Sequence, residues 1–357
     1  MGYVRFFLAI SVVFSHGFVT YMVGGRLAVQ LFFMISGFLM SYVLNESNKY
    51  ELKHVFYRSR FLRIFPIYFV VASATLVYFL IHDSVSSIAF FDVYSNSGVV
   101  ATLMLVLANL LIFLQDVVMF FRTSPDGLTF VSNFREFDQQ LWRGLLVPQA
   151  WTLSLELIFY LIFPFIFNKR KTIVVIFLVS LFLKGFFVMS GIGRVDPWSY
   201  RFFPFEICWF LLGALSHIYV FPIFNRRKTS KVAPWIVSVC CFAICFFHFL
   251  PYKLLFSFIF LFIFSLLLPI LFSFRSRLDS FLGALSFPIY ICHMLVIYVI
   301  YEFAGVDDYK EADILSFSLV ISVVLCLSYL LERYIGVYFD KLRFSKIPSN
   351  VKVKYEF

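Results

Sequence analysis

Residues 1–18 read MGYVRFFLAISVVFSHGF, an apolar run with an arginine near one end and a histidine near the other. Such apolar runs are typical of membrane-spanning helices, in which ionisable residues are costly and therefore point to function. Eleven residues are close to three helical turns, so Arg5 and His16 share one helix face, about 16 Å apart along the axis. The stretch predicts a membrane helix with a polar stripe.

The composition of the whole chain agrees with this interpretation. Its 357 residues are 62% hydrophobic and only 14% charged, whereas a soluble domain carries about a quarter charged residues. The net charge of +10 is concentrated in short loops, so positive-inside topology explains it better than a nucleic-acid partner. The six cysteines lie inside apolar runs without metal-ligand spacing, and we expect neither a metal site nor a disulfide.

Eleven apolar segments are long enough to cross the hydrocarbon layer. They are residues 3–22, 27–45, 62–81, 99–120, 149–167, 172–190, 202–221, 233–250, 254–273, 283–303 and 312–334. The expected fold is an all-α polytopic transmembrane bundle. We expect one membrane-embedded domain over residues 1–340 and a basic cytoplasmic tail over residues 341–357.

The basic loops constrain how many of these segments cross. They lie at 53–63, 169–171, 226–231, 275–277 and in the tail, and positive-inside topology requires an even number of crossings between neighbouring loops. Between residues 63 and 169 there are three candidate spans, an odd number, so one of them should not cross fully. The 99–120 segment is the expected incomplete crossing, because Asn109, Gln115 and Asp116 interrupt its second half. About ten crossings follow, with both termini cytoplasmic.

A cluster of arginines precedes the third span, in HVFYRSRFLRIFPIYF (residues 54–69). Arg58, Arg60 and Arg63 are expected first as a cytoplasmic charge anchor, since basic residues commonly flank membrane spans. The alternative is that Arg60 and Arg63, at i and i+3, lie side by side and form a guanidinium fork for phosphate.

Other polar residues fall inside the apolar segments. Ser36 and Gly37 favour close helix packing, and approach of a ligand to the backbone is the alternative. Trp151 and Tyr160 suit interfacial anchors. Glu156 lies inside a span, so it should pair with a cation or be protonated. A structural ion pair and a role in an active site are equally compatible with its position.

Three further polar positions lie in the last two spans. His293 is expected to be a hydrogen-bonded structural residue, and Glu302 is expected to reach the outer interface. Glu332 and Arg333 suit an interfacial ion pair at the cytoplasmic end. Taken together, these polar residues predict either a transport pathway or a buried active site.

The order of these motifs resembles that of the acyltransferase-3 family of integral membrane acyltransferases. Arg5 and His16 match a basic residue and a histidine separated by ten residues, and Phe32 to Phe38 match F-F-x-x-S-G-F. The other matches are Arg60, Arg63, Ile64, Pro66 and Tyr68; Trp151, Leu153, Glu156, Phe159 and Tyr160, with Thr152 replacing the usual Ser; Ser286, Tyr290 and His293; and Glu332. Arg333-Tyr334 follows Glu332 where the family commonly has x-Pro.

The resemblance implies a stand-alone enzyme of a bacterial inner membrane that O-acetylates a surface glycan such as O-antigen, capsule or exopolysaccharide, or its lipid-linked precursor. It implies acetyl-coenzyme A as the donor, with no permanently bound cofactor and with the lipid bilayer as surroundings. Arg60 and Arg63, with Arg58 beside them, would then bind the phosphates of coenzyme A.

From this resemblance, His16 is expected to be the general base or the carrier of an acyl-histidine relay. Arg5 would continue the positive path or stabilise the oxyanion. Glu156 or Glu332 would orient His16 or balance an arginine. Ser36, Trp151, Tyr160 and His293 are expected to contact substrate or support the site. Loops 82–98 and 121–148 would select the acceptor.

Three alternatives remain open at this stage. They are a glycolipid transporter or flippase, an acyltransferase that acts on a small molecule, and a catalytically inactive relative.

Overall fold

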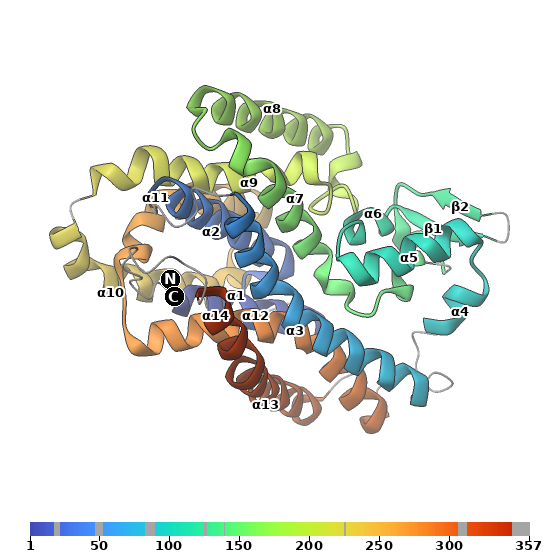
Figure 1. Cartoon of the computed structure of the whole chain (residues 1–357). Helices are drawn as coiled ribbons and strands as arrows, with labels where there is room; N and C mark the ends of the chain where they lie inside the picture. Colours follow the sequence, from blue (N-terminus) through green and yellow to red (C-terminus); the bar gives the residue numbers. More distant parts are fainter. Residues whose placement is uncertain are drawn as a thin grey trace.

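Long apolar helices make up most of the chain in the computed structural model (Figure 1). The structure describes residues 1–17, 22–46, 53–82, 90–124, 127–138, 140–224, 226–305 and 313–344. The long helices are α1 (Gly2–Gly17), α2 (Gly24–Glu46), α3 (Lys53–His82), α7 (Trp151–Ile166), α8 (Arg170–Met189), α9 (Phe203–Leu215), α10 (Arg226–Phe246), α11 (Lys253–Ser273), α12 (Arg277–Ala304) and α13 (Ile314–Leu331). Shorter elements are α4 (Phe90–Ser95), α5 (Val99–Leu111), α6 (Gln115–Val118), the antiparallel hairpin β1 (Phe121–Ser124) and β2 (Gly127–Phe130), and α14 (Val337–Phe344).

The expected all-α polytopic bundle is confirmed. In the described part of the chain, nine helices are long and apolar enough to cross a membrane, and α1 and α5 are shorter apolar helices. Each of the eleven predicted segments coincides with helical structure. Residues 341–344, the first of the expected tail, belong to the helix α14, and residues 345–357 lie outside the described residues.

The 99–120 segment is not one continuous helix. Helix α5 ends at Leu111, and Ile112 and Leu114 take positive φ values of 67° and 72°, so the chain turns before α6 begins. Thirteen helical residues span about 20 Å, less than the ~30 Å hydrocarbon core. This geometry agrees with the expectation that the segment fails to cross.

The polar residues that interrupt this segment tie it to its neighbours. The Asn109 side chain donates to the Gly144 carbonyl and the Tyr94 hydroxyl, and it accepts from the Leu146 amide. Gln115 donates to the Tyr68 hydroxyl of α3. These bonds satisfy buried polar groups that a straight membrane helix would leave without partners.

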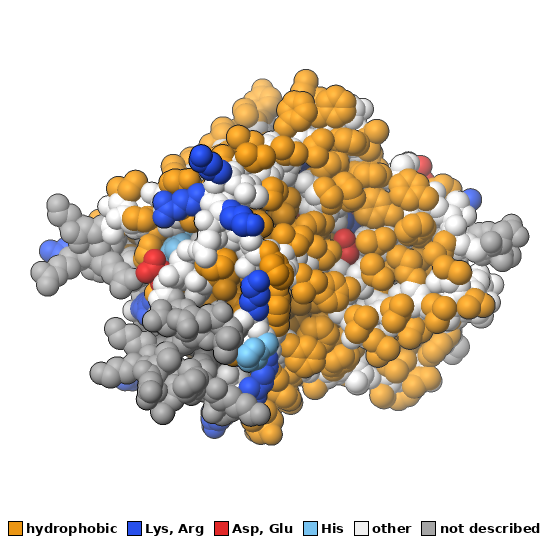
Figure 2. Space-filling model, turned by 45° about the horizontal axis from the view of Figure 1, so that its top comes forward, with side chains coloured by type: hydrophobic (Ala, Val, Ile, Leu, Met, Phe, Trp, Pro, Cys, Tyr) orange, Lys and Arg blue, Asp and Glu red, His pale blue; other side chains and the backbone are white. Residues whose placement is uncertain are grey.

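Helices α1, α2, α9 and α12 form the centre of the bundle. The centre is tight because glycines let backbones approach: a Cβ on Gly37 of α2 would overlap the Phe210 carbonyl of α9, and one on Gly213 would overlap the Met34 carbonyl. This confirms the packing interpretation of Gly37. The outer helices instead expose large apolar side chains, such as Phe182, Trp235 and Leu315, as a lipid-facing surface requires; Figure 2 shows one apolar face of this kind.

The two ends of the bundle differ in charge. The basic loops gather at the end of α1 that carries Arg5, where Lys53 lies over the Phe165 ring and Arg58 bonds the Leu342 carbonyl. Lys and Arg side chains accordingly line one side of the face in Figure 2. We call this the Arg5 end, and the opposite end of α1 the His16 end. The side chains of residues 226–230 and the basic residues of the tail after 344 lie outside the described residues.

Candidate active site

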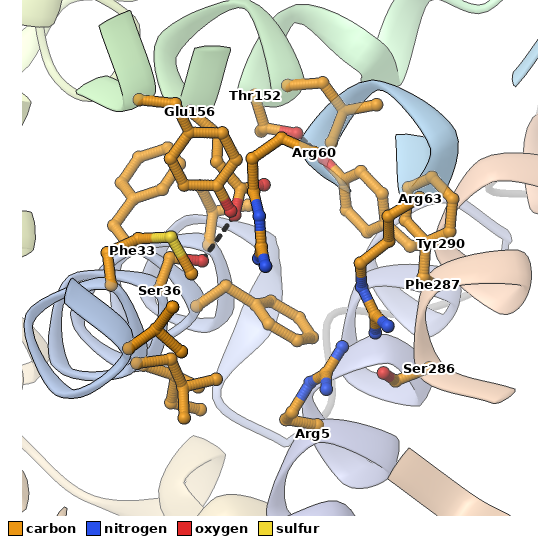
Figure 3. Close-up of a pocket in the computed structure, with 18 of the residues that line it drawn as sticks. Arg5, Phe33, Ser36, Arg60, Arg63, Thr152, Glu156, Ser286, Phe287 and Tyr290 are labelled. Atoms are coloured by element: carbon orange, nitrogen blue, oxygen red, sulfur yellow. Dashed lines mark hydrogen bonds between the residues drawn. The ribbon is translucent and has the colours of Figure 1, made fainter. Parts of the chain in front are cut away.

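A pocket opens between α1, α2, α3, α7 and α12 near the Arg5 end (Figure 3). It combines apolar walls with a few polar groups, as ligand sites usually do. We call it the arginine pocket. Its polar lining consists of Arg5, Ser36, Arg60, Arg63, Thr152, Glu156, Tyr160, Ser286, Tyr290 and Arg343, and its apolar lining includes Phe32, Phe33, Leu39 and Phe287.

Besides Arg343 of α14, which pairs with Asp340, three guanidinium groups reach into this pocket from two helices. Arg60 and Arg63 lie one turn apart on α3, and Arg5 approaches from α1, so the three point toward a common space (Figure 3). None of the three has a carboxylate within 4.0 Å among the described residues. Arg60 is buried and its Nε has no hydrogen-bond partner in the described part of the chain. One buried and two half-buried cations that lack a direct ion pair favour an anionic ligand.

Glu156 is the acid of the pocket. It accepts hydrogen bonds from Ser36 of α2, at 2.5 Å, and from Tyr160 one turn further along α7. Its charge also acts on Arg5, although no direct ion pair forms. Glu156 therefore fixes Ser36 and Tyr160 and partly offsets the arginines.

A second cavity adjoins the arginine pocket at the Arg5 end. Arg5, Leu39 and Arg63 line both, and the second cavity continues to Arg275, Asp279 and Glu332. Glu332 is half-buried and close enough to Arg63 and Arg5 for electrostatic interaction. The expected ion pair between Glu332 and Arg333 is not among the described contacts, and Arg333 is exposed. The two cavities together form a route into the bundle, with charges of both signs in the outer cavity and mainly arginines in the inner one.

Not every predicted residue lies in this pocket. Arg58 is exposed and donates to the Leu342 carbonyl, so the structure separates it from Arg60 and Arg63. Glu302 accepts from Tyr78 and pairs with His82 at 3.3 Å, which joins α12 to α3 at the His16 end.

His16 lies in the last turn of α1, at the other end of the bundle, and is exposed. Its ring lies 5.4 Å from the ring of His293 on α12. His293 is fully buried, and its Nδ1 bonds the Tyr290 carbonyl at 2.8 Å, which sets Nδ1 as the protonated nitrogen. Its Nε2 has no partner among the described residues and is left as an acceptor. Tyr290 lines the arginine pocket, so the histidine pair is one turn of α12 away from that pocket.

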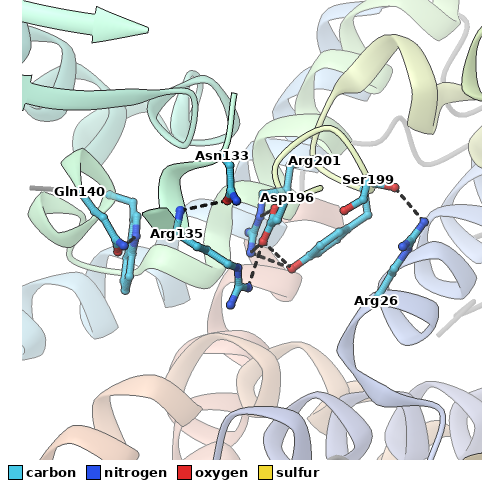
Figure 4. Close-up of polar contacts among 9 residues, drawn as sticks. Arg26, Asn133, Arg135, Gln140, Asp196, Ser199 and Arg201 are labelled. Atoms are coloured by element: carbon cyan, nitrogen blue, oxygen red, sulfur yellow. Dashed lines mark hydrogen bonds and ion pairs between the residues drawn. The ribbon is translucent and has the colours of Figure 1, made fainter. Parts of the chain in front are cut away.

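A polar cluster lies near His16, formed by Asp196 and Arg201 of the loop between α8 and α9 and by Arg135 of the segment between β2 and α7 (Figure 4). Asp196 is bound by Arg201 at 2.7 Å and by Arg135 at 3.0 Å, and both arginines lie close enough to His16 for electrostatic interaction. Although burial acts in the opposite direction, these two arginines hold the pKa of Asp196 below its usual value. Trp151 stacks beneath Arg201, whose guanidinium carbon lies 4.4 Å from the centre of an indole ring.

Of the two roles expected for Glu156 and Glu332, orienting His16 or balancing an arginine, the geometry favours the second. Neither Glu156 nor Glu332 is a described hydrogen-bond partner of His16; both serve the arginines instead. The described neighbours of His16 are instead His293 and the arginines that bind Asp196. Sequence reasoning missed this cluster because polar loop residues carry no periodic signal.

It also missed the buried pair of Lys184 and Glu206, which Gln30 extends. Here a signal was available, because both residues are ionisable and fall inside predicted spans.

Comparison with known proteins identifies the family of the chain. The model of the acyltransferase-3 family, described as an acyltransferase domain, matches residues 1–333. The chain belongs to this family. No curated protein matches the chain, and no solved structure matches it.

Proposed function

We propose that this membrane acyltransferase moves an acetyl group from cytoplasmic acetyl-coenzyme A to a hydroxyl of a surface glycan or of its lipid-linked precursor. One observation carries the proposal: α1 has Arg5 in a pocket where Arg5, Arg60 and Arg63 form no direct ion pair among the described residues, and it has His16 exposed at its other end. Donor and acceptor would reach the same reaction centre from opposite ends of one bundle.

The donor enters at the Arg5 end. Arg60 and Arg63 bind phosphate groups of coenzyme A, for which two guanidinium forks one turn apart are suited. Arg5 continues the positive lining toward the interior. The apolar wall formed by Phe32, Phe33 and Phe287 receives the uncharged pantetheine arm. Arg58, outside the pocket, takes no part.

The acceptor is activated at the His16 end. His16 takes the proton of the acceptor hydroxyl while the hydroxyl oxygen attacks the thioester carbonyl carbon. The carbonyl π electrons move onto the carbonyl oxygen, which becomes an oxyanion. The double bond then re-forms as the carbon–sulfur bond breaks, and the departing coenzyme A thiolate takes up the proton from His16. His293 beside His16 supports the ring, and Arg201 is placed to stabilise negative charge.

An acyl-histidine relay uses the same residues in two steps, with His16 carrying the acyl group before the acceptor arrives. A small-molecule acceptor is compatible with the same chemistry. Transport of a glycolipid is the rival outside the enzyme class.

The test uses purified protein in nanodiscs with acetyl-coenzyme A and glycolipid extracted from the host. The wild type is expected to release coenzyme A thiol only when extract is present. His16→Ala should lower that rate by at least about a hundredfold, with acetyl-coenzyme A binding retained. His54→Ala, which changes an exposed histidine of α3, is the control and should be unaffected. Full activity in a folded His16→Ala protein would remove His16 from the mechanism, and glycolipid binding without thiol release would favour transport.

A further inference from the structure

A separate cavity lies at the His16 end, between α2, α9 and α11. Leu27, Phe258 and Leu261 line it with apolar surface, and Arg26, Lys253 and His248 line it with basic groups. We call it the side cavity. Neither the acyl donor nor the histidine pair occupies it in the mechanism above.

The side cavity has an excess of positive charge. Among the described residues, its lining contains no carboxylate. Lys184 also lines it, but Glu206 behind the lining neutralises that cation. Arg26 and Lys253 have no carboxylate within 4.0 Å in the described part of the chain. Two cations above an apolar wall suit a ligand with an anionic head and a hydrocarbon body.

Trp209 of α9 lines the side cavity and is fully buried, and its Nε1 has no hydrogen-bond partner among the described residues. Because this Nε1 is itself covered by protein atoms, Trp209 contributes aromatic surface to the cavity wall rather than a donor.

The side cavity lies close to the proposed site of acyl transfer. A Cβ on Gly25 would lie 2.7 Å from Ser15 Oγ, so the residues next to Arg26 and His16 touch. Arg26 donates to the Ser199 carbonyl at 3.1 Å (Figure 4) and faces the Tyr200 ring. Tyr200 in turn contacts Arg201 of the cluster that lies near His16.

We propose that the side cavity binds the phosphate and first hydrocarbon units of a lipid carrier, so that the glycan attached to this phosphate reaches His16. The inference rests on the proposed function and narrows it: the acceptor is the lipid-linked precursor rather than the finished polysaccharide. Arg26 and Lys253 hold the phosphate, and Leu27 and Phe258 contact the chain.

The probe is farnesyl phosphate, a short isoprenoid phosphate, measured by native mass spectrometry of the full-length protein in detergent micelles. Farnesol and inorganic phosphate are separate arms, and phosphatidylglycerol is a competitor. Arg26→Gln and Lys253→Gln are each expected to weaken farnesyl phosphate binding by about tenfold or more. Arg194→Gln, an exposed arginine in the loop after α8, is the matched control and should bind as the wild type does.

Acetyl-coenzyme A binding, measured on the same samples, reports the fold of each variant and tests the proposed function independently. Lys253 is exposed, so Lys253→Gln keeps the test valid even where Arg26→Gln impairs folding. Farnesyl phosphate binding that falls in both variants and exceeds that of farnesol and phosphate supports the inference.

Three results would overturn it: equal binding of inorganic phosphate, which indicates a free-anion site; equal competition by phosphatidylglycerol, which indicates a structural lipid; or no dependence on Arg26 and Lys253. If the wild type binds farnesyl phosphate but not acetyl-coenzyme A, the proposed function is overturned, whereas the assignment of the side cavity as a lipid-phosphate site is retained.

Discussion

Arg60 and Arg63 stand one helical turn apart on α3 and reach the same pocket, whereas Arg58 on the same helix faces outward. We predict that Arg60→Gln weakens acetyl-coenzyme A binding by roughly tenfold or more, because a charge-assisted bond to phosphate is lost. Arg58→Gln removes the same charge from the same helix and should change the dissociation constant less than threefold. Isothermal titration calorimetry measures the acetyl-coenzyme A affinity of both variants. Equal losses of affinity would show that the arginines act through general surface charge and not through binding in the pocket.

Asp196 gives a prediction that depends on pH. Its pKa is lowered in the folded protein, so the stability it contributes is present above the ordinary aspartate value of about 4 and is lost as pH falls through the folded value. Asp196→Asn leaves buried Arg201 without its partner and should cost about 3–5 kcal/mol at neutral pH. Thermal unfolding of the wild type and the variant between pH 7 and pH 3 should show the difference shrinking at the acid end.

Asp138→Asn is the control, because this aspartate is exposed and has no described ion pair. An effect of Asp196→Asn that stays constant across this pH range would contradict the assignment.

Single residues of the candidate site could be predicted from the sequence where they fall inside or beside apolar helices. Arg5, Arg60, Arg63 and Glu156 were all singled out from their position in or beside predicted spans, and they line one pocket. Arg135, Asp196 and Arg201 lie in loops, where polarity is ordinary and carries no signal. Their association depends on loop folding that spacing along the chain does not encode.

At the scale of elements, the contact of α2 with α9 depends on glycines. Gly37→Ala would place a methyl group on the Phe210 carbonyl, so we predict a loss of about 1–3 kcal/mol as the helices separate. Gly185→Ala on α8 meets nothing within 4 Å and should be neutral or stabilising by up to about 1 kcal/mol. Thermal unfolding in one detergent compares the two, and equal shifts would contradict the close packing.

The break after α5 makes a prediction about topology. Asn96 precedes α5 and Glu136 follows it, and both are exposed. If α5 does not cross, Asn96→Cys and Glu136→Cys will both react with a membrane-impermeant maleimide on intact spheroplasts. Lys169→Cys, after α7, should react only after lysis, and the unmodified chain gives the background. Labelling of only one of the first two cysteines would show that α5 crosses.

Hydropathy located the helical segments because a bilayer requires long apolar runs. It could not place the end of α5, which depends on positive φ angles at Ile112 and Leu114 and on side-chain bonds from Asn109. The parity of the basic loops nevertheless indicated that one of the three segments between residues 63 and 169 fails to cross, and Asn109, Gln115 and Asp116 pointed to this one. Charge distribution thus carried information about it that hydropathy alone lacked.

At the scale of the whole molecule, the bundle has a positively lined pocket toward one end and a histidine pair near the other. This polarity is the physical basis of the proposed transfer across the membrane, since an anionic donor is held at the basic end while an acceptor hydroxyl is activated opposite. The ordered motifs along the chain indicated the family, but only the fold separates Glu156 and Glu332 from His16.

The most direct test of this account is mass spectrometry of the surface glycans of the native host, with the gene intact, deleted, or restored as His16→Ala at matched protein level. The account predicts that an acetyl-sized mass increment disappears on deletion and stays absent with His16→Ala. A fall in the amount of surface glycan with its mass unchanged would contradict the account and identify the protein as a transporter.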